Sequence, residues 1–218
     1  MTTPDEHAPP QFDADFRARL RDLILWRRDV RRFRTDAVAP ELVATLIELA
    51  GRAPSVGRCQ PWRFVLVESE EARSAVQASF ARANAQALEG YAGEQRQLYA
   101  QLKLAGLKEA PVQLAVYADE ETEAGAGLGR QSMPETLRYS VVAAVQTLWL
   151  AARAYGLGVG WVSILEPKTV DAALEAPEAW TLIAYLCIGW PQEEHIDPEL
   201  ERAGWQAEIE TEGLVFRR

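Results

Sequence analysis

An aspartate stands among arginines near the start of the chain, in the segment Arg27-Arg28-Asp29-Val30-Arg31-Arg32-Phe33. The formal net charge is -9, yet residues 17–34 hold eight of the 23 Lys and Arg residues and only two acids. Guanidinium groups match phosphate oxygens in geometry, and their close spacing favours a compact anion over a long polyanion. The alternative is an arginine-rich helix end in water, where the helix dipole favours cations.

The composition limits the classes of protein. At 218 residues, 48% hydrophobic and 25% charged, the chain can bury a sizeable core. No apolar run reaches the ~18 residues that span a bilayer, and the acidic balance argues against sequence-independent nucleic-acid binding. The start of the chain lacks the pattern of a signal peptide. We therefore expect a cytoplasmic protein with a flexible extension over residues 1–12 and a single domain over residues 13–218, with no nucleic-acid or membrane partner.

Several common chemical sites have no support in the sequence. The two cysteines, Cys59 and Cys187, lie in contexts typical of structural residues, and the two histidines are isolated, so we predict neither a disulfide framework nor a metal site. No dinucleotide fingerprint or phosphate loop follows a strand. The glycines of residues 156–160 precede a predicted strand, which indicates a tight helix-to-strand turn.

The apolar pattern predicts the elements that would position the arginine cluster. We expect helices over residues 13–29, from Pro40 to about residue 52, and over 135–155, with two further helices in 70–108 separated near Gly90 and Gly93. We expect strands over 64–67, 112–117, 159–165 and 181–189. The 135–155 helix is apolar nearly all round, which indicates either the centre of a domain or a subunit interface.

Four segments together carry a resemblance to a known family: the arginine cluster, Ala53 to Trp62, Leu104 to Pro111, and Gly158-Val159-Gly160-Trp161-Val162-Ser163. In this combination the chain, from about residue 20 onward, resembles the FMN-dependent nitroreductase-like family. The resemblance implies an α+β fold with a central mixed sheet flanked by helices. It also implies a homodimer with the long buried helix at its interface.

The resemblance further implies which residues bind the flavin. Arg27, Arg28 and Arg31 would hold the FMN phosphate and nearby flavin atoms, and Leu104 would contact the side of the ring. The complete set of implied cofactor-binding residues is Arg27, Arg28, Asp29, Val30, Arg31, Ser55, Leu104 and Ser163. The chain departs from the family pattern at Arg58, where asparagine is common, and the role of the C-terminal Arg217 and Arg218 is open. We expect a lid within residues 86–103.

Asp29 indicates which branch of the family the chain resembles. Ordinary nitroreductases usually have R-R-S-x-R, with serine at this position. The branch with aspartate uses dioxygen to fragment reduced FMN into 5,6-dimethylbenzimidazole, the lower ligand of cobalamin, and D-erythrose 4-phosphate. By this resemblance the catalytic residues are Asp29, as a base kept ionised by the arginines, and Ser163, which would orient the flavin or oxygen. An external reductase would supply reduced FMN. The alternatives are an NAD(P)H-dependent nitroreductase that recycles FMN and a non-catalytic flavin carrier.

Overall fold

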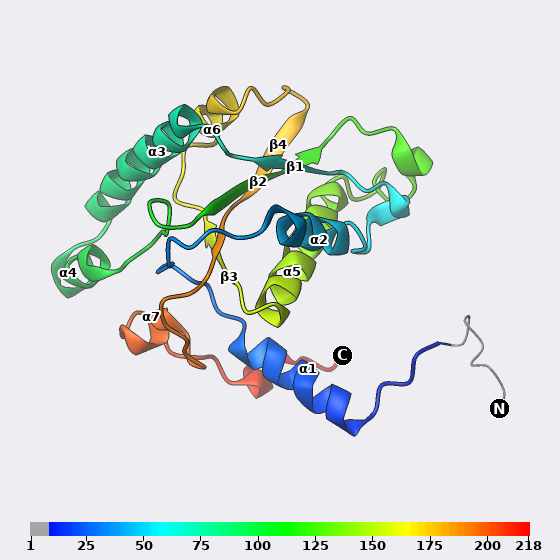
Figure 1. Cartoon of the computed structure of the whole chain (residues 1–218), viewed down its shortest axis with the longest axis horizontal. Coiled ribbons are helices and arrows are strands. Elements are labelled where there is room, and N and C mark those ends of the chain that lie inside the picture. Colours follow the sequence, from blue (N-terminus) through cyan, green and yellow to red (C-terminus); the bar gives the residue numbers. More distant parts are fainter. Residues whose placement is uncertain (1–8) are drawn as a thin grey trace.

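A four-stranded antiparallel sheet forms the centre of the computed structural model, which describes residues 9–218 (Figure 1). Its strands, in the spatial order β1-β2-β4-β3, are β1 (Trp62–Leu66), β2 (Val112–Asp119), β4 (Trp180–Gly189) and β3 (Gly158–Val162). The α+β class with a helix-flanked sheet is confirmed, but the sheet is not mixed: strands that run in the same direction are separated by an antiparallel neighbour. A parallel pairing occurs outside the named strands, in an isolated bridge between Asp29 and Val159.

Helices cover both faces of this sheet. The helices are α1 (Ala14–Trp26), α2 (Pro40–Ala50), α3 (Glu70–Glu89), α4 (Gly93–Gln101), α5 (Thr136–Ala154), α6 (Pro167–Ala173) and α7 (Glu199–Arg202), with short 3-10 turns η1 (Val56–Arg58), η2 (Ala124–Gly127) and η3 (Thr211–Leu214). Helices α2 and α5 lie on one face, and α3 and α6 lie on the other (Figure 1). None of the helices within residues 9–218 is both long and apolar enough to cross a membrane.

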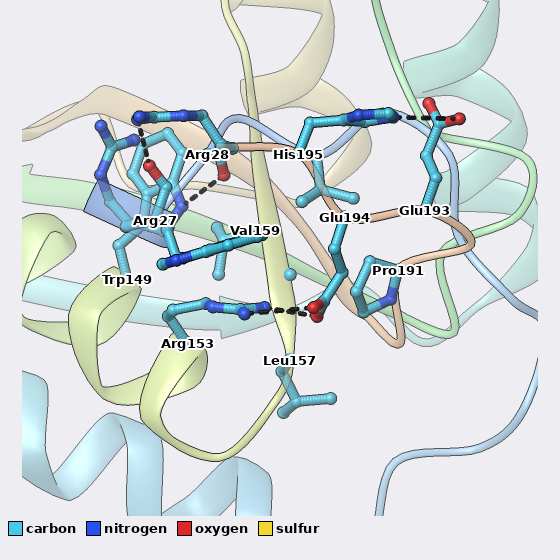
Figure 2. Close-up of a pocket in the computed structure, with 13 residues that line it drawn as sticks. Arg27, Arg28, Trp149, Arg153, Leu157, Val159, Pro191, Glu193, Glu194 and His195 are labelled. Atoms are coloured by element: carbon cyan, nitrogen blue, oxygen red, sulfur yellow. Dashed lines mark hydrogen bonds and ion pairs between the residues drawn. The ribbon is translucent and has the colours of Figure 1, made fainter. Parts of the chain in front are cut away.

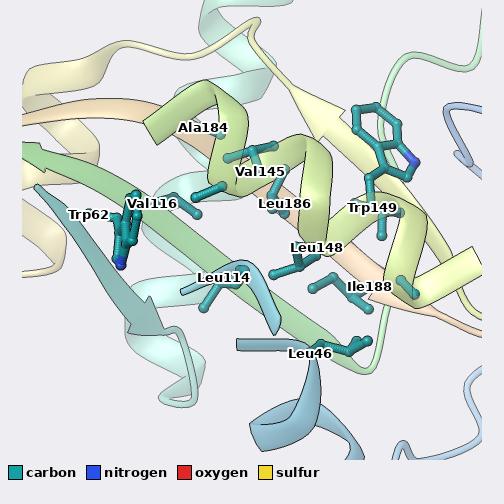
Figure 3. Close-up of a cluster of buried hydrophobic side chains, with 14 of the residues drawn as sticks. Leu46, Trp62, Leu114, Val116, Val145, Leu148, Trp149, Ala184, Leu186 and Ile188 are labelled. Carbon is teal, nitrogen blue, oxygen red and sulfur yellow. The ribbon is translucent and has the colours of Figure 1, made fainter. Parts of the chain in front are cut away.

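The hydrophobic core is divided between these two faces because successive strand residues point in opposite directions. In β2, Leu114 and Val116 pack toward α2 and α5 (Figure 3), whereas Ala115 and Tyr117 pack toward α3 and α6. The six central residues of β2 are buried; Leu114 to Ala118 form an apolar run, and the buried Gln113 donates to the Leu107 carbonyl at 2.8 Å.

The long helix α5 has the predicted position, and one of its sides is buried within the chain. Val141, Val145 and Leu148 are fully buried against the sheet and α2, while Tyr139 and Val142 remain 56% and 40% exposed. The buried side faces the sheet, and the apolar remainder of the helix faces solvent in a single chain. This remainder is available for contact with another molecule.

Helix α1 is shorter than predicted. It ends at Trp26, since Arg27 already has an extended backbone (φ -72°, ψ 114°). None of its 13 residues, all of which the structure describes, is buried, although the helix packs against α5. The arginine cluster is therefore not a helix end but an extended segment that follows one.

Candidate active site

The segment Arg27–Phe33 lies against the edge strand β3, and two glycines make this contact possible. The Val30 N–H donates to the Val159 carbonyl at 3.0 Å. A Cβ at Gly158 would lie 2.7 Å from Val30 Cγ2, and a Cβ at Gly160 would overlap the Val30 carbonyl oxygen. Only a strand without side chains at these two positions admits the segment. Of the glycines in residues 156–160, Gly156 alone forms the predicted helix-to-strand turn, because Gly158 and Gly160 lie in β3.

Gly156 ends α5 in a Schellman motif. Its φ is +78°, the Leu157 N–H donates to the Ala152 carbonyl at 2.9 Å, and the Gly156 N–H donates to the Arg153 carbonyl at 3.0 Å. This turn leads directly into β3, which ends at Val162 and not at residue 165 as predicted. Ser163 therefore follows the strand, and its side chain is exposed.

Asp29 is the one acidic residue of the segment. Its Oδ1 accepts a hydrogen bond from the Trp161 N–H at 2.9 Å, and its Oδ2 accepts one from Arg31 Nε at 2.9 Å. The Asp29 side chain nevertheless stays 33% exposed. The carboxylate is thus oriented by two donors on one side and remains open to a ligand on the other.

The arginines of the cluster differ in what they contact. Arg32 pairs with Glu199 at 2.6 Å and Glu193 at 3.3 Å, and the hydrogen bond that Arg32 donates to Glu199 raises the pKa of Arg32. Arg34 pairs with Asp36 at 2.8 Å. Both of these cations are neutralised by nearby carboxylates, so they contribute little to a binding site for an anion.

Arg27 and Arg28 have no carboxylate within ion-pair distance among residues 9–218, although Asp197, Glu201 and Glu208 act on Arg28 from farther away. Within residues 9–218 neither guanidinium forms an ion pair; Arg27 stacks 5.0 Å from the centre of the Trp149 ring, and Arg28 Nε donates to the Ile196 carbonyl at 2.7 Å. Burial, with a smaller contribution from Arg27, lowers the pKa of Arg28. Both line a small cavity of ≈ 30 Å³ with Trp149 and Arg153 (Figure 2); Glu193 and Glu194 line it as well, and Glu194 pairs with Arg153 at 2.6 Å.

Arg31 connects the segment to the loop that holds Leu104. Its Nη1 donates to the Lys103 carbonyl at 3.2 Å, and Leu104 follows directly. Ser163 lies close by as well, because the two residues from Trp161 to Ser163 span at most about 7 Å. The structure thus places these residues along β3: Val30 lies against Gly158 to Gly160, Asp29 binds Trp161, and Ser163 follows the end of the strand.

Ser55 lies elsewhere in the chain. Its Oγ accepts from the Gln60 N–H at 3.1 Å, and the neighbouring Val56 N–H donates at 3.0 Å to Ser140 in the first turns of α5. Arg27 packs on Trp149, nine residues further along the same helix, or about 14 Å at 1.5 Å per residue. A single chain therefore does not bring Ser55 to the arginines.

The loop after Ser55 has an unusual backbone. Gly57, Arg58 and Gln60 all have positive φ, at 54°, 56° and 47°, and a Cβ at Gly57 would lie 2.9 Å from the Leu128 carbonyl oxygen. Such conformations are costly for residues other than glycine and persist where the surroundings impose them. Arg58, the residue at which the chain departs from the family pattern, therefore has a strained backbone conformation.

Several site residues were not found from the sequence. Trp149 stacks against Arg27, and Trp161, which packs on the core, also contributes its backbone N–H to Asp29. A sequence pattern does not show which backbone groups bind a side chain. The hydrogen bonds of the Trp161 N–H and the Ile196 carbonyl could therefore not have been predicted. Cys59 and Cys187 are both buried and free, and burial raises the pKa of Cys187 to about 12, as suits a structural thiol.

An antiparallel sheet between two helical layers, with an arginine segment on its edge strand, is a nitroreductase-like α+β fold. Residues 24–190 match the model of the Nitroreductase family, and the chain belongs to that family. It is 58% identical over 198 residues to the 5,6-dimethylbenzimidazole synthase of Rhodospirillum rubrum, covering 91% of this chain and 94% of that protein.

Solved structures agree with this assignment. Oxidized iodotyrosine deiodinase bound to FMN and 3-iodo-L-tyrosine superposes with a TM-score of 0.68 at 27% identity, covering 81% of this chain and 91% of that chain. A BluB-like flavoprotein from Clostridium difficile 630 shares the fold with a TM-score of 0.66 at 20% identity, over 91% of this chain and 98% of that one. The predicted family resemblance is confirmed.

Proposed function

We propose that this protein is a 5,6-dimethylbenzimidazole synthase that converts reduced FMN and dioxygen into 5,6-dimethylbenzimidazole and D-erythrose 4-phosphate. The observation that carries the proposal is Asp29, a carboxylate that is one third exposed and is held by the Trp161 N–H and Arg31 at the edge of β3. The 58% identity to a synthase of that name supports the same reaction. The product would serve as the lower ligand of cobalamin, and we place the reaction in the cytoplasm.

The free guanidinium groups fit a flavin phosphate. Arg27 has no carboxylate partner within residues 9–218, and an anion beside it would gain charge-assisted hydrogen bonds of about 1.5–3 kcal/mol each. In this proposal Arg27 and Arg28 hold the phosphate, while Arg31 and Leu104 lie beside the ring. Bound reduced flavin would supply both the electrons for dioxygen and the carbon atoms of the product.

Asp29 is the proposed base. Its two donors fix the carboxylate in one orientation, and its exposed side can accept a proton from a ligand at hydrogen-bond distance. Ser163, exposed just beyond β3, would donate or accept a hydrogen bond and orient the reacting group. The remaining possibility for Asp29 is a purely structural role, in which it only orders Arg31 and β3.

We further propose a homodimer that completes the flavin site. Exposed apolar residues lie on α5 at Tyr139 and Val142, and in the C-terminal segment at Leu214, Val215 and Phe216. Two α5 helices packed in opposite directions would place the end near Ser55 of one copy beside the end near Arg27 of the other. This arrangement removes the separation of about 14 Å within one chain. A separate flavin reductase would supply the reduced FMN.

One assay tests the reaction. Purified protein is incubated with FMN, an external flavin reductase and air, and 5,6-dimethylbenzimidazole is sought by mass spectrometry. Intact flavin and no product at stoichiometric protein would refute the proposal. Steady NAD(P)H oxidation with a nitroaromatic compound, with the flavin retained, would instead support the nitroreductase alternative; reduced FMN that stays stable in air would support a carrier.

A further inference from the structure

The chain after β4 crosses the arginine segment as a C-terminal strap, residues 191–205. The Gln192 N–H donates to the Arg32 carbonyl at 3.0 Å, and the Ile196 carbonyl accepts from Arg28 at 2.7 Å. Glu199 pairs with the Arg32 guanidinium at 2.6 Å. The strap is therefore bound to the arginine segment at three successive points.

The strap ends in a turn that directs Trp205 away from it. Gly204 has φ +75°, the Trp205 N–H donates to the Leu200 carbonyl at 2.8 Å, and the Gly204 N–H donates to the Glu201 carbonyl at 2.9 Å. These are the two hydrogen bonds of a Schellman motif, which requires a left-handed residue at Gly204. The direction of the Trp205 side chain is thus set by the backbone of α7.

Trp205 meets two tyrosines on and before α4. Its ring centre lies 5.4 Å from that of Tyr91, edge to face at 85°, and 6.0 Å from that of Tyr99. The two tyrosine rings lie 4.9 Å apart, and Tyr99 Oη donates to Asn84 of α3 at 2.7 Å. The three rings form an aromatic cluster that joins the strap to α4.

Helix α4 has few other attachments. It begins at Gly93 without a side-chain cap, and Tyr99 is the only buried residue of its nine, all of which are described. It leads into Lys103, whose carbonyl accepts from Arg31, and then into Leu104. Helix α4 thus flanks the arginine site, within the region predicted as a lid; it is held to α3 by Tyr99 and by the hydrogen bond from Arg96 to the Leu88 carbonyl at 2.9 Å, and to the strap by the aromatic cluster.

We propose that Trp205 is a positioning residue that fastens α4 to the C-terminal strap and so limits exchange of the ligand at the arginine site. The identity of the ligand as a flavin phosphate rests on the proposed function, whereas the role of Trp205 in holding α4 to the strap does not. While Trp205 lies against Tyr91 and Tyr99, α4 and the strap move together. Without its ring α4 can open while the strap stays on Arg28 and Arg32.

The test compares the full-length Trp205→Ala variant with Trp205→Phe and Gln206→Ala. Gln206 is the matched control, because it is the next residue, is exposed, and hydrogen-bonds only Ala207. We expect hydrogen exchange of residues 91–104 in the flavin-free Trp205→Ala protein to accelerate about tenfold, which corresponds to 1.4 kcal/mol. FMN release in stopped flow should accelerate by a similar factor. In Trp205→Phe, hydrogen exchange of residues 91–104 and FMN release should both be close to the native rates. In Gln206→Ala, both rates should be unchanged.

A folded Trp205→Ala protein with unchanged exchange over residues 91–104 and unchanged FMN release would overturn the inference. If that variant does not fold, Tyr91→Ala removes the edge partner from the other side and must give the same faster exchange. If the native protein does not bind FMN, the proposed function fails, while the exchange measurement in flavin-free protein still decides the role of Trp205.

Discussion

Replacing Gly160 by alanine should separate the arginine segment from the sheet. The added Cβ would overlap the Val30 carbonyl oxygen, a backbone atom that cannot turn aside. Relief of the overlap requires loss of the hydrogen bond between Val30 N–H and Val159 and of the one between Trp161 N–H and Asp29. A neutral hydrogen bond contributes about 1 kcal/mol and one to a charged group about 1.5–3 kcal/mol, so we expect a loss of about 3 kcal/mol.

Thermal unfolding and FMN titration measure this effect. About 3 kcal/mol corresponds to a Tm lower by roughly 6–12 °C in a chain of this size, and FMN affinity should fall with it because Asp29 and Arg31 lose their position. Gly156→Ala is the matched control: its Cβ would meet nothing closer than 3.8 Å, but its φ of +78° costs about 1–2 kcal/mol in stability. Gly156→Ala should therefore lower Tm with unchanged FMN affinity. Wild-type FMN affinity in Gly160→Ala would refute the reasoning.

Three further predictions concern Asp29, the arginines and Asp171. Asp29→Asn should keep FMN affinity and abolish product by mass spectrometry; an unaltered yield would remove its chemical role. Arg27→Ala should weaken FMN binding about 10- to 100-fold, the loss of one charge-assisted hydrogen bond, whereas Arg34→Ala should leave the titration unchanged. Burial raises the pKa of Asp171, so the folded state favours its protonated form and stability is lost as pH rises through that pKa. Asp171→Asn should therefore raise Tm at pH 7, and the increase at pH 4 should be smaller. An equal increase in Tm at the two pH values would contradict this prediction.

Local sequence signals predicted most of the elements correctly. Pro40 begins α2, Gly90 and Gly93 separate α3 from α4, and Gly156 ends α5. Each of these residues acts through its own backbone preference, which is a property of a few neighbouring residues and is therefore visible in sequence.

Other boundaries depended on contacts between distant parts of the chain. The apolar spacing extended the first helix to residue 29, but the helix ends at Trp26 because Asp29 and Val30 bind β3, about 130 residues later. The pattern of α5 could not show that Tyr139 and Val142 face solvent, since periodicity reports apolar character and not which neighbour is present.

The sequence by itself determined the chemistry available to this protein: an arginine group with one aspartate inside it, and the family to which the chain belongs. The tertiary structure decided which of those groups remain free. Carboxylates neutralise Arg32 and Arg34, whereas Arg27 stacks on Trp149. The Trp161 N–H orients the Asp29 carboxylate through a hydrogen bond. The physical reason is that a charge acts according to its partners in space, and these partners come from β3, α5 and the strap, far away in the chain.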